Sequence, residues 1–302
     1  MRQEKVRDKA GKAKVRKGSK DQKESLHARE IPEIEPYVNR IICGDAVHVL
    51  AGIPSESVDL VITSPPYNFG HAYAQDPHDD TREWNEYFAT LNRIWAECAR
   101  VLRPGGRMAV NVQPLFSDYV PTHHIISNQL SGLGLLWKAE FLWEKNNYNA
   151  KYTAWGSWKS PSMPYVKYTW EFVEVFDKGT HKKTGRREDI DITADEFKEW
   201  VIGRWKIPPE HHMKEFDHPA MFPEELPRRL MKLFSYRNDI VLDPFNGAGT
   251  TTLVAAKLGR RFIGIDVSRQ YCNMALHRLQ MLPSTESASV ASHPPDIPVR
   301  DA

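Results

Sequence analysis

A glycine-rich turn near the C-terminus constrains the fold of this 302-residue chain more than any other feature. The apolar run 240–243 leads into the turn 244–249, and a helix-forming segment begins at Thr250. Gly247 and Gly249 allow the backbone to turn tightly and to approach a ligand closely. The N-terminus of the following helix offers free N–H groups and the positive end of the helix dipole. The segment therefore predicts an α/β sheet with a ligand site at the end of this strand.

A second predicted strand, 261–266, ends in Asp266. Nucleotide-binding αβ units place the acid that holds ribose hydroxyls about twenty residues beyond the glycines, where Asp266 stands. The third glycine of the dinucleotide-binding pattern is missing, because Thr252 occupies its position. This departure argues against a nicotinamide-dependent dehydrogenase, the alternative from a different class of enzyme. The glycines alone are also compatible with a purely structural turn.

Short apolar runs alternate with longer amphipathic ones between residues 36 and 282, which is typical of an α/β sheet protein. We predict seven strands, at 39–43, 58–63, 106–112, 135–143, 171–177, 239–243 and 261–266. We predict six helices, at 46–53, 83–102, 121–133, 223–234, 250–258 and 268–280. The predicted fold is α/β and Rossmann-like: a mixed, mostly parallel seven-stranded sheet with helices on both faces, plus a small insertion.

The insertion is the segment 178–217, which is charged and lacks a clear strand period. The plainer interpretation is a surface loop with a short helix around 195–203. A loop of this length inside a compact domain is usually functional or disordered.

Four residues directly after the second predicted strand form an unusual turn, Ser64-Pro65-Pro66-Tyr67. The two prolines fix the backbone and donate nothing to a strand ladder, so the chain must leave the sheet here. A loop at the carboxyl end of a strand is where an open α/β sheet places its ligand. A hydroxyl, a held carbonyl and an aromatic face together suit a planar amine. A tight structural turn is the alternative interpretation.

The Ser64–Tyr67 turn resembles the catalytic motif of amino-group DNA methyltransferases, which that family writes [DNS]-PP-[YFW]. The segment 243–251 resembles the family's cofactor motif, with Phe245, Gly247 and Gly249 in its FxGxG core. The catalytic motif precedes the cofactor motif, as in the group called β. The resemblance extends over about residues 37–282, and it includes the segments 43–45, 141–145, 155–158 and 218–223.

The resemblance implies an S-adenosyl-L-methionine-dependent, site-specific methyltransferase that acts on the exocyclic amino group of a base flipped out of double-stranded DNA. Ser64 before the prolines favours N4 of cytosine, and N6 of adenine is the alternative. An RNA or protein-glutamine methyltransferase and an inactive DNA-binding relative are further alternatives. The catalytic residues implied are Ser64, Pro65, Pro66 and Tyr67. The cofactor-binding residues implied are Asp45, Asp243, Phe245, Asn246, Gly247, Ala248, Gly249, Thr250, Thr251 and Asp266.

The implied mechanism gives these residues distinct roles. Ser64 Oγ and the Pro65 carbonyl accept the two amino hydrogens, and Tyr67 stacks on the base. Asp266 holds the ribose hydroxyls and Asp45 the adenine amino group. Asp243 either contacts the cofactor or caps the glycine loop. No metal is needed.

The sequence divides into a basic arm at 1–36, a catalytic part at 37–177 and a candidate target-recognition region at 178–217. An S-adenosylmethionine-binding part at 218–282 and a tail at 283–302 follow, and both termini are predicted to be disordered. Residues 1–30 hold eleven Lys or Arg against five Asp or Glu. This arm either clamps DNA phosphates through counterion release or is a solvated tail.

Several negative features bound the cellular context. No run of eighteen apolar residues and no secretory signal are present, so no membrane association is expected. Three scattered cysteines fit a reducing cytoplasm and show no metal-ligand spacing. Because the sequence holds no recognisable nuclease module, a cognate restriction endonuclease would be a separate protein. Members of the β group are often dimers, so the resemblance implies a homodimer.

Overall fold

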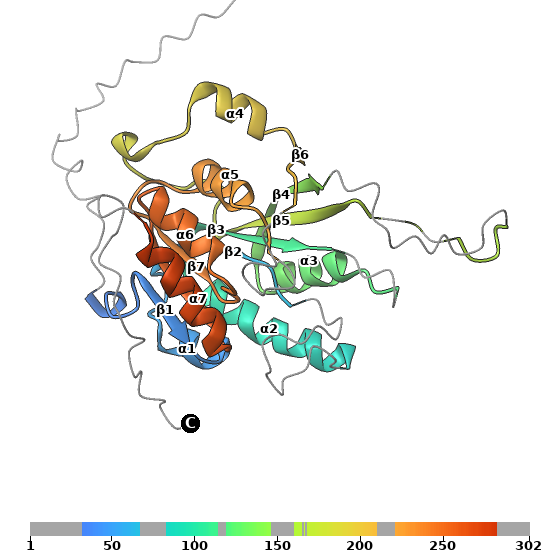
Figure 1. The fold of residues 1–302 in the computed structure, drawn as a ribbon, viewed down its shortest axis with the longest axis horizontal. Coiled ribbons are helices and arrows are strands. Elements are labelled where there is room, and N and C mark those ends of the chain that lie inside the picture. Colours follow the sequence, from blue (N-terminus) through green and yellow to red (C-terminus); the bar gives the residue numbers. More distant parts are fainter. Residues whose placement is uncertain are drawn as a thin grey trace, which may run out of the picture. The chain divides into compact units, whose positions relative to one another are not determined.

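An eight-stranded mixed sheet lies at the centre of the described part of the chain (Figure 1). The computed structural model describes residues 32–66, 83–113, 119–145, 160–164, 166, 168–209 and 221–282. The strands are β1 (Arg40–Cys43), β2 (Val58–Thr63), β3 (Leu102–Val112), β4 (Leu135–Glu144), β5 (Trp170–Lys178), β6 (Arg204–Lys206), β7 (Ile240–Asp243) and β8 (Arg261–Asp266). Their order across the sheet is β1-β8-β7-β2-β3-β5-β4-β6.

The direction of the strands gives the sheet two different edges. The five neighbouring strands β1, β8, β7, β2 and β3 pair in parallel, whereas β5 is antiparallel to β3 and β4. Strand β6 pairs in parallel with β4. Every described strand except β5 therefore ends at one edge, where β5 begins. We call this the carboxyl edge and the opposite one the amino edge; open α/β sheets bind their ligands at the carboxyl edge.

The helices form two groups that cover opposite faces of the sheet (Figure 1). One group is α1 (Ala46–Gly52), α2 (Trp84–Val101) and α3 (Thr122–Gly132), in which α2 contacts both others. The other group is α4 (Ala194–Trp200), α5 (Glu225–Phe234), α6 (Thr250–Lys257) and α7 (Arg269–Gln280), which contact one another in sequence. None of the described helices is long and apolar enough to cross a membrane.

The apolar pattern of each element explains its place. All six residues of β2 are buried, as expected for a central parallel strand covered on both faces. Helix α2 buries one stripe of side chains spaced three or four positions apart. These residues are Tyr87, Leu91, Ile94, Trp95, Cys98 and Val101. Helix α6 buries its residues from Thr250 to Ala256, because it lies between the sheet and the helices α5 and α7.

The predicted fold class is confirmed, and each of the seven predicted strands is present. The prediction missed one strand, β6, which lies inside the segment 178–217. A strand of three residues is too short to produce a recognisable alternation of apolar and polar residues. The short helix expected around 195–203 is α4, at Ala194–Trp200.

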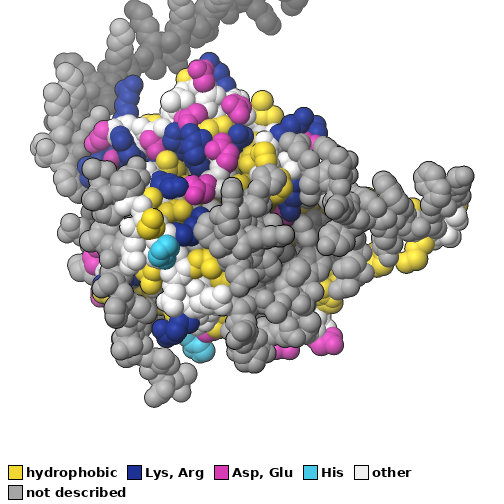
Figure 2. Space-filling model, viewed as in Figure 1, with side chains coloured by type: hydrophobic (Ala, Val, Ile, Leu, Met, Phe, Trp, Pro, Cys, Tyr) yellow, Lys and Arg dark blue, Asp and Glu magenta, His cyan; other side chains and the backbone are white. Residues whose placement is uncertain are grey.

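The described part of the segment 178–217 runs from the amino edge to the carboxyl edge. Near its start, Lys183 Nζ lies 2.9 Å from Asp59 Oδ1 and 3.2 Å from Asp239 Oδ2, both at the amino edge. Helix α4 then packs on α5, and β6 reaches the end of β4. Figure 2 shows charged side chains of both signs intermixed over this region. Glu196 of α4 pairs with Arg228 over 2.7 Å, and so contributes to this mixture.

Candidate active site

The carboxyl edge brings the predicted site residues together from distant parts of the sequence. Asp45 follows β1, Asp266 ends β8, Asp243 ends β7 and Ser64 follows β2. These four strands are consecutive neighbours in the sheet. Tyr67 lies outside the described residues. The two motifs are therefore adjacent in space, as the fold requires of a single site.

The glycine-rich turn, which we call the cofactor loop (residues 244–249), is held by the end of β8. Gly247 N donates to Asp266 Oδ2 over 2.7 Å, and Ser268 N donates to Asp266 Oδ1 over 2.9 Å. Gly247 and Gly249 have φ values of 50° and 83°, in the left-handed region that favours glycine. Each carboxylate oxygen of Asp266 has a second lone pair, so two backbone bonds leave it able to accept hydroxyl hydrogens.

Asn246 anchors the cofactor loop from below. Its side chain is buried, and its Oδ1 accepts a hydrogen bond from Thr252 Oγ1 over 3.1 Å. A Cβ atom at Gly264 would lie 2.7 Å from Asn246 Cγ, so only glycine fits at this position of β8. Thr252 therefore has a structural task at the position where dinucleotide-binding enzymes carry their third glycine.

Asp243 is bonded within the protein on the side of the catalytic turn. Its Oδ1 accepts hydrogen bonds from Thr63 Oγ1 over 2.7 Å and from Phe245 N over 3.0 Å. Burial raises the pKa of Asp243 to about 6, while the bonds from Thr63 and Phe245 oppose this rise. Asp243 thus joins the end of β2 to the start of the cofactor loop, as a loop cap would.

Asp45 and Asp266 lie at adjoining strand ends. Gly44 N donates to the Asp266 carbonyl over 2.9 Å, which connects the end of β1 to the end of β8. Asp45 is the N-cap of α1, and its Oδ1 accepts from His48 N over 3.1 Å. Its side chain is 54% exposed and can also contact a ligand. Two carboxylates therefore face the same end of the sheet.

Helix α2 braces both halves of the site. Tyr87 OH donates to the Pro66 carbonyl over 2.6 Å, which fixes the turn after Ser64. About two turns further along α2, the ring of Trp95 meets the ring of Phe245 edge to face, with centroids 5.9 Å apart. Pro65 is buried, whereas Ser64 and Pro66 are half-buried. The Ser-Pro-Pro turn and the cofactor loop are consequently held against one rigid element.

The structure adds three residues to this edge that the sequence analysis did not single out. Asn111 at the end of β3, Glu171 at the start of β5 and Lys145 after β4 form one polar cluster. Asn111 Nδ2 donates to Glu171 Oε2 over 2.5 Å, and Lys145 pairs with the same carboxylate. Polar residues inside apolar strands were the available signal, but only strand pairing brings them together.

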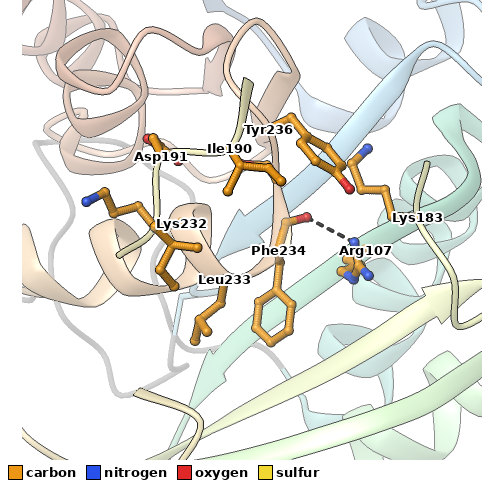
Figure 3. Close-up of a pocket in the computed structure, with 10 residues that line it drawn as sticks. Arg107, Lys183, Ile190, Asp191, Lys232, Leu233, Phe234 and Tyr236 are labelled. Atoms are coloured by element: carbon orange, nitrogen blue, oxygen red, sulfur yellow. Dashed lines mark hydrogen bonds between the residues drawn. The ribbon is translucent and has the colours of Figure 1, made fainter. Parts of the chain in front are cut away.

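A separate cavity of about 170 Å³ opens at the amino edge (Figure 3). Its lining includes the cations Arg107, Lys183 and Lys232, and Figure 3 shows Arg107 donating to the Phe234 carbonyl. Each cation already has an acidic partner, such as Asp177 for Arg107 at 3.3 Å. These ion pairs and the distance from the motifs make the cavity a poor candidate for the reaction. No group of three metal-ligating side chains is found within the described ranges.

A model of the DNA methylase family matches residues 58–277, which is most of the chain. The chain belongs to this family. Type II methyltransferase M.BglII of Bacillus subtilis is 30% identical over 276 residues, covering 87% of this chain and 75% of that protein. Type II methyltransferase M.MjaI of Methanocaldococcus jannaschii is 31% identical, covering 76% of this chain and 88% of that protein.

Solved structures agree with the fold. A DNA modification methylase of Thermus thermophilus, TTHA0409, in complex with S-adenosyl-L-methionine, superposes with a TM-score of 0.63 at 30% identity. That match covers 79% of this chain and 92% of the other. PvuII DNA methyltransferase superposes with a TM-score of 0.61 at 22% identity, covering 81% of this chain and 86% of the other. This chain is an S-adenosylmethionine-dependent DNA methyltransferase of the N4/N6 family.

The residues of the carboxyl edge fit S-adenosylmethionine. The cofactor carries ribose hydroxyls and a cationic sulfonium group, and the edge offers the carboxylates of Asp266 and Asp45. The buried Asn246 Nδ2 finds no acceptor among the described residues, which leaves one donor beside the loop. The left-handed glycines let a ligand approach the backbone between Asn246 and Thr250.

Proposed function

We propose that this methyltransferase modifies N4 of cytosine in double-stranded DNA, after the base has been flipped out of the helix. The observation that carries the proposal is the place of Ser64. It follows β2 at the carboxyl edge and precedes the rigid prolines Pro65 and Pro66. Through Thr63 and Asp243 it is coupled to the cofactor loop.

The proposed reaction depends on hydrogen-bond acceptors rather than on a metal or a covalent intermediate. An exocyclic amine is a weak nucleophile, because its lone pair is delocalised into the ring. Ser64 Oγ and the Pro65 carbonyl accept the two N–H hydrogens and favour a pyramidal nitrogen with a free lone pair. S-adenosylmethionine, when bound, supplies an electrophilic methyl group. Positioning of the nitrogen is then the main contribution of the protein to the rate.

Serine at position 64 favours cytosine for a steric and electrostatic reason. A hydroxyl is short and neutral, which suits the smaller pyrimidine ring. A carboxylate or carboxamide reaches further from the backbone, which suits an amine held on the larger purine. Tyr67, assigned from the family resemblance, would stack on either ring. N6-adenine methylation is therefore the second candidate for the same site.

We also propose that residues 178–217 contain the target-recognition region. Their first part lies at the amino edge, away from Ser64, so the residues from β6 onward are the better candidates for DNA contact. Strand β6 exposes Arg204 and Lys206 beside the end of β4. Exposed cations at the carboxyl edge suit contacts with phosphates. Exchange of this region with that of a relative of different specificity should redirect methylation.

The names of the relatives M.BglII and M.MjaI suggest the biological context. Both are Type II methyltransferases. We propose that this chain likewise protects DNA in a restriction-modification system, with its endonuclease as a separate cytoplasmic protein.

The target base can be identified directly. The protein is expressed in a host free of DNA methylation, and the host DNA is sequenced with a method that detects both N4-methylcytosine and N6-methyladenine. We expect N4-methylcytosine at one short recognition sequence, and its absence from DNA made with Ser64→Ala. N6-methyladenine alone would overturn the assignment to cytosine and leave the DNA methyltransferase activity intact.

A further inference from the structure

The polar cluster of Asn111, Glu171 and Lys145 is costly to bury. Asn111 and Glu171 are each 3% exposed, and the Lys145 side chain is 21% exposed. A buried ion pair loses hydration, and apolar replacements of similar volume are often as stable. Stability alone is therefore a weak reason for this cluster. Its place at the carboxyl edge, beside the proposed catalytic turn, points to a role in the reaction.

The pairing of β2 with β3 places Asn111 beside Ser64. Thr63 is in register with Val110, and continuing this register by one residue pairs Ser64 with Asn111. Side chains alternate between the two faces along each strand, so paired positions share a face. Asn111 and Ser64 therefore belong on one face of the sheet, and Thr63, which bonds Asp243, belongs on the other.

The role proposed for Ser64 makes a demand on its hydroxyl hydrogen. A serine hydroxyl carries one hydrogen and two lone pairs. If Ser64 Oγ is to accept a hydrogen from the amino group, its own hydrogen must point to another acceptor. Glu171, paired with Lys145, accepts from Asn111 Nδ2 and so fixes the orientation of the amide. The amide oxygen of Asn111 then faces away from Glu171.

We propose that Asn111 Oδ1 accepts the hydrogen bond of the Ser64 hydroxyl and thereby directs a lone pair of Ser64 Oγ at the amino group of the flipped base. Asn111 is then a positioning residue that acts through Ser64, and Glu171 with Lys145 holds it in place. This inference rests on the proposed role of Ser64. It applies equally to a cytosine and an adenine amino group.

A double-mutant cycle tests the inference. The full-length enzyme and the variants Ser64→Ala, Asn111→Ala and Ser64→Ala/Asn111→Ala are compared for kcat and KM on duplex DNA that contains the recognition sequence. We expect Asn111→Ala to lower kcat about tenfold, as for one lost hydrogen bond, with unchanged KM for DNA. The double variant should be no slower than Ser64→Ala, because Asn111 acts only through the serine.

A second variant provides a readout that a structural role would not change. In Asn111→Asp the new carboxylate can still accept from Ser64, but its other oxygen faces Glu171. The two carboxyl groups must then share a proton. We expect kcat of Asn111→Asp to fall as pH rises between 6 and 9, relative to the wild-type profile over the same range. Glu174→Gln, another buried acid of β5, is the matched control and should leave kcat at pH 8 unchanged.

Three results separate the possible failures. Full activity of Ser64→Ala would overturn the proposed function together with this inference. A slow Ser64→Ala with an Asn111→Ala variant within threefold of wild type would overturn the inference alone. The inference would also be overturned if the two substitutions slowed the double variant multiplicatively. Binding of S-adenosylmethionine by calorimetry confirms that each variant is folded; if Asn111→Ala does not fold, Asn111→Leu takes its place in the cycle.

Discussion

Thr63 Oγ1 donates a 2.7 Å hydrogen bond to Asp243 Oδ1, across 180 positions of sequence. Both residues are buried, with exposed fractions of 0% and 2%. Thr63 immediately precedes the turn at Ser64, and Asp243 immediately precedes the cofactor loop. A reaction that joins an amine to a methyl group requires the two partners at a fixed distance of about 3–3.5 Å. This bond contributes to that distance by joining the two motifs at their bases.

The Thr63–Asp243 bond can be removed with little change of shape. Thr63→Val leaves Asp243 without one of its donors in a buried site, so the free energy of unfolding should fall by about 1–3 kcal/mol. Thr63→Ser keeps the hydroxyl and serves as the control. Urea denaturation of both variants measures the difference. Equal stability of the two variants would show that the hydroxyl contributes nothing.

The carboxylate of Asp266 is expected to bind the cofactor directly. Asp266→Ala should weaken S-adenosylmethionine binding at least about tenfold, the loss expected for a hydrogen bond to a charged group. Asp266→Asn keeps one acceptor for Gly247 N and should give an intermediate loss. Calorimetry measures both affinities, with Asp195→Ala on the exposed start of α4 as the control. Unchanged affinity in Asp266→Ala would exclude Asp266 from the site.

The sequence predicted the fold well because most strands carry long apolar runs. Strand β2 has no exposed residue, and such a run between glycine and proline turns is unmistakable. The start of β3 was placed at 106, whereas the strand begins at Leu102, which pairs with Val58. The residues Pro104 and Gly105 signal a turn, and the pairing overrides that local signal.

The sequence predicted the motif residues of the site but not those that surround them. Ser64 and Asp266 stand in segments whose spacing and neighbours are distinctive. Asn111 and Glu171 are single polar residues within apolar strands, 60 positions apart, so no local pattern relates them. Their proximity follows from the register of an antiparallel pair, which depends on the whole sheet.

Gly264 allows the close approach of β8 to Asn246. Because its φ lies outside the left-handed region, the effect of Gly264→Ala is steric: the new Cβ would lie 2.7 Å from Asn246 Cγ. We expect Asn246 to move, the cofactor loop to shift, and affinity for S-adenosylmethionine to fall about tenfold or more. The free energy of unfolding should fall by about 1–3 kcal/mol. Gly132→Ala has open space around its Cβ and is the control for both measurements.

Glu174 of β5 makes stability depend on pH. Its side chain is buried, and burial together with the neighbouring Glu140 raises the pKa of Glu174 from 4.5 to about 7. Trp137 Nε1 donates to Glu174 Oε2 over 3.3 Å, which opposes the rise. The folded protein thus binds this proton more tightly than the unfolded chain does.

The sign of the effect follows from this difference in proton affinity. Below about pH 4.5 both states are protonated, and the full stability is present. As pH rises from 4.5 to 7, the unfolded chain loses its proton first, so the free energy of unfolding falls by up to about 1.4 kcal/mol per pH unit. Glu174→Gln should remove this fall and be more stable than wild type at pH 8. Urea denaturation at pH 5, 6, 7 and 8 measures both proteins, and parallel curves would show that Glu174 does not titrate in this range.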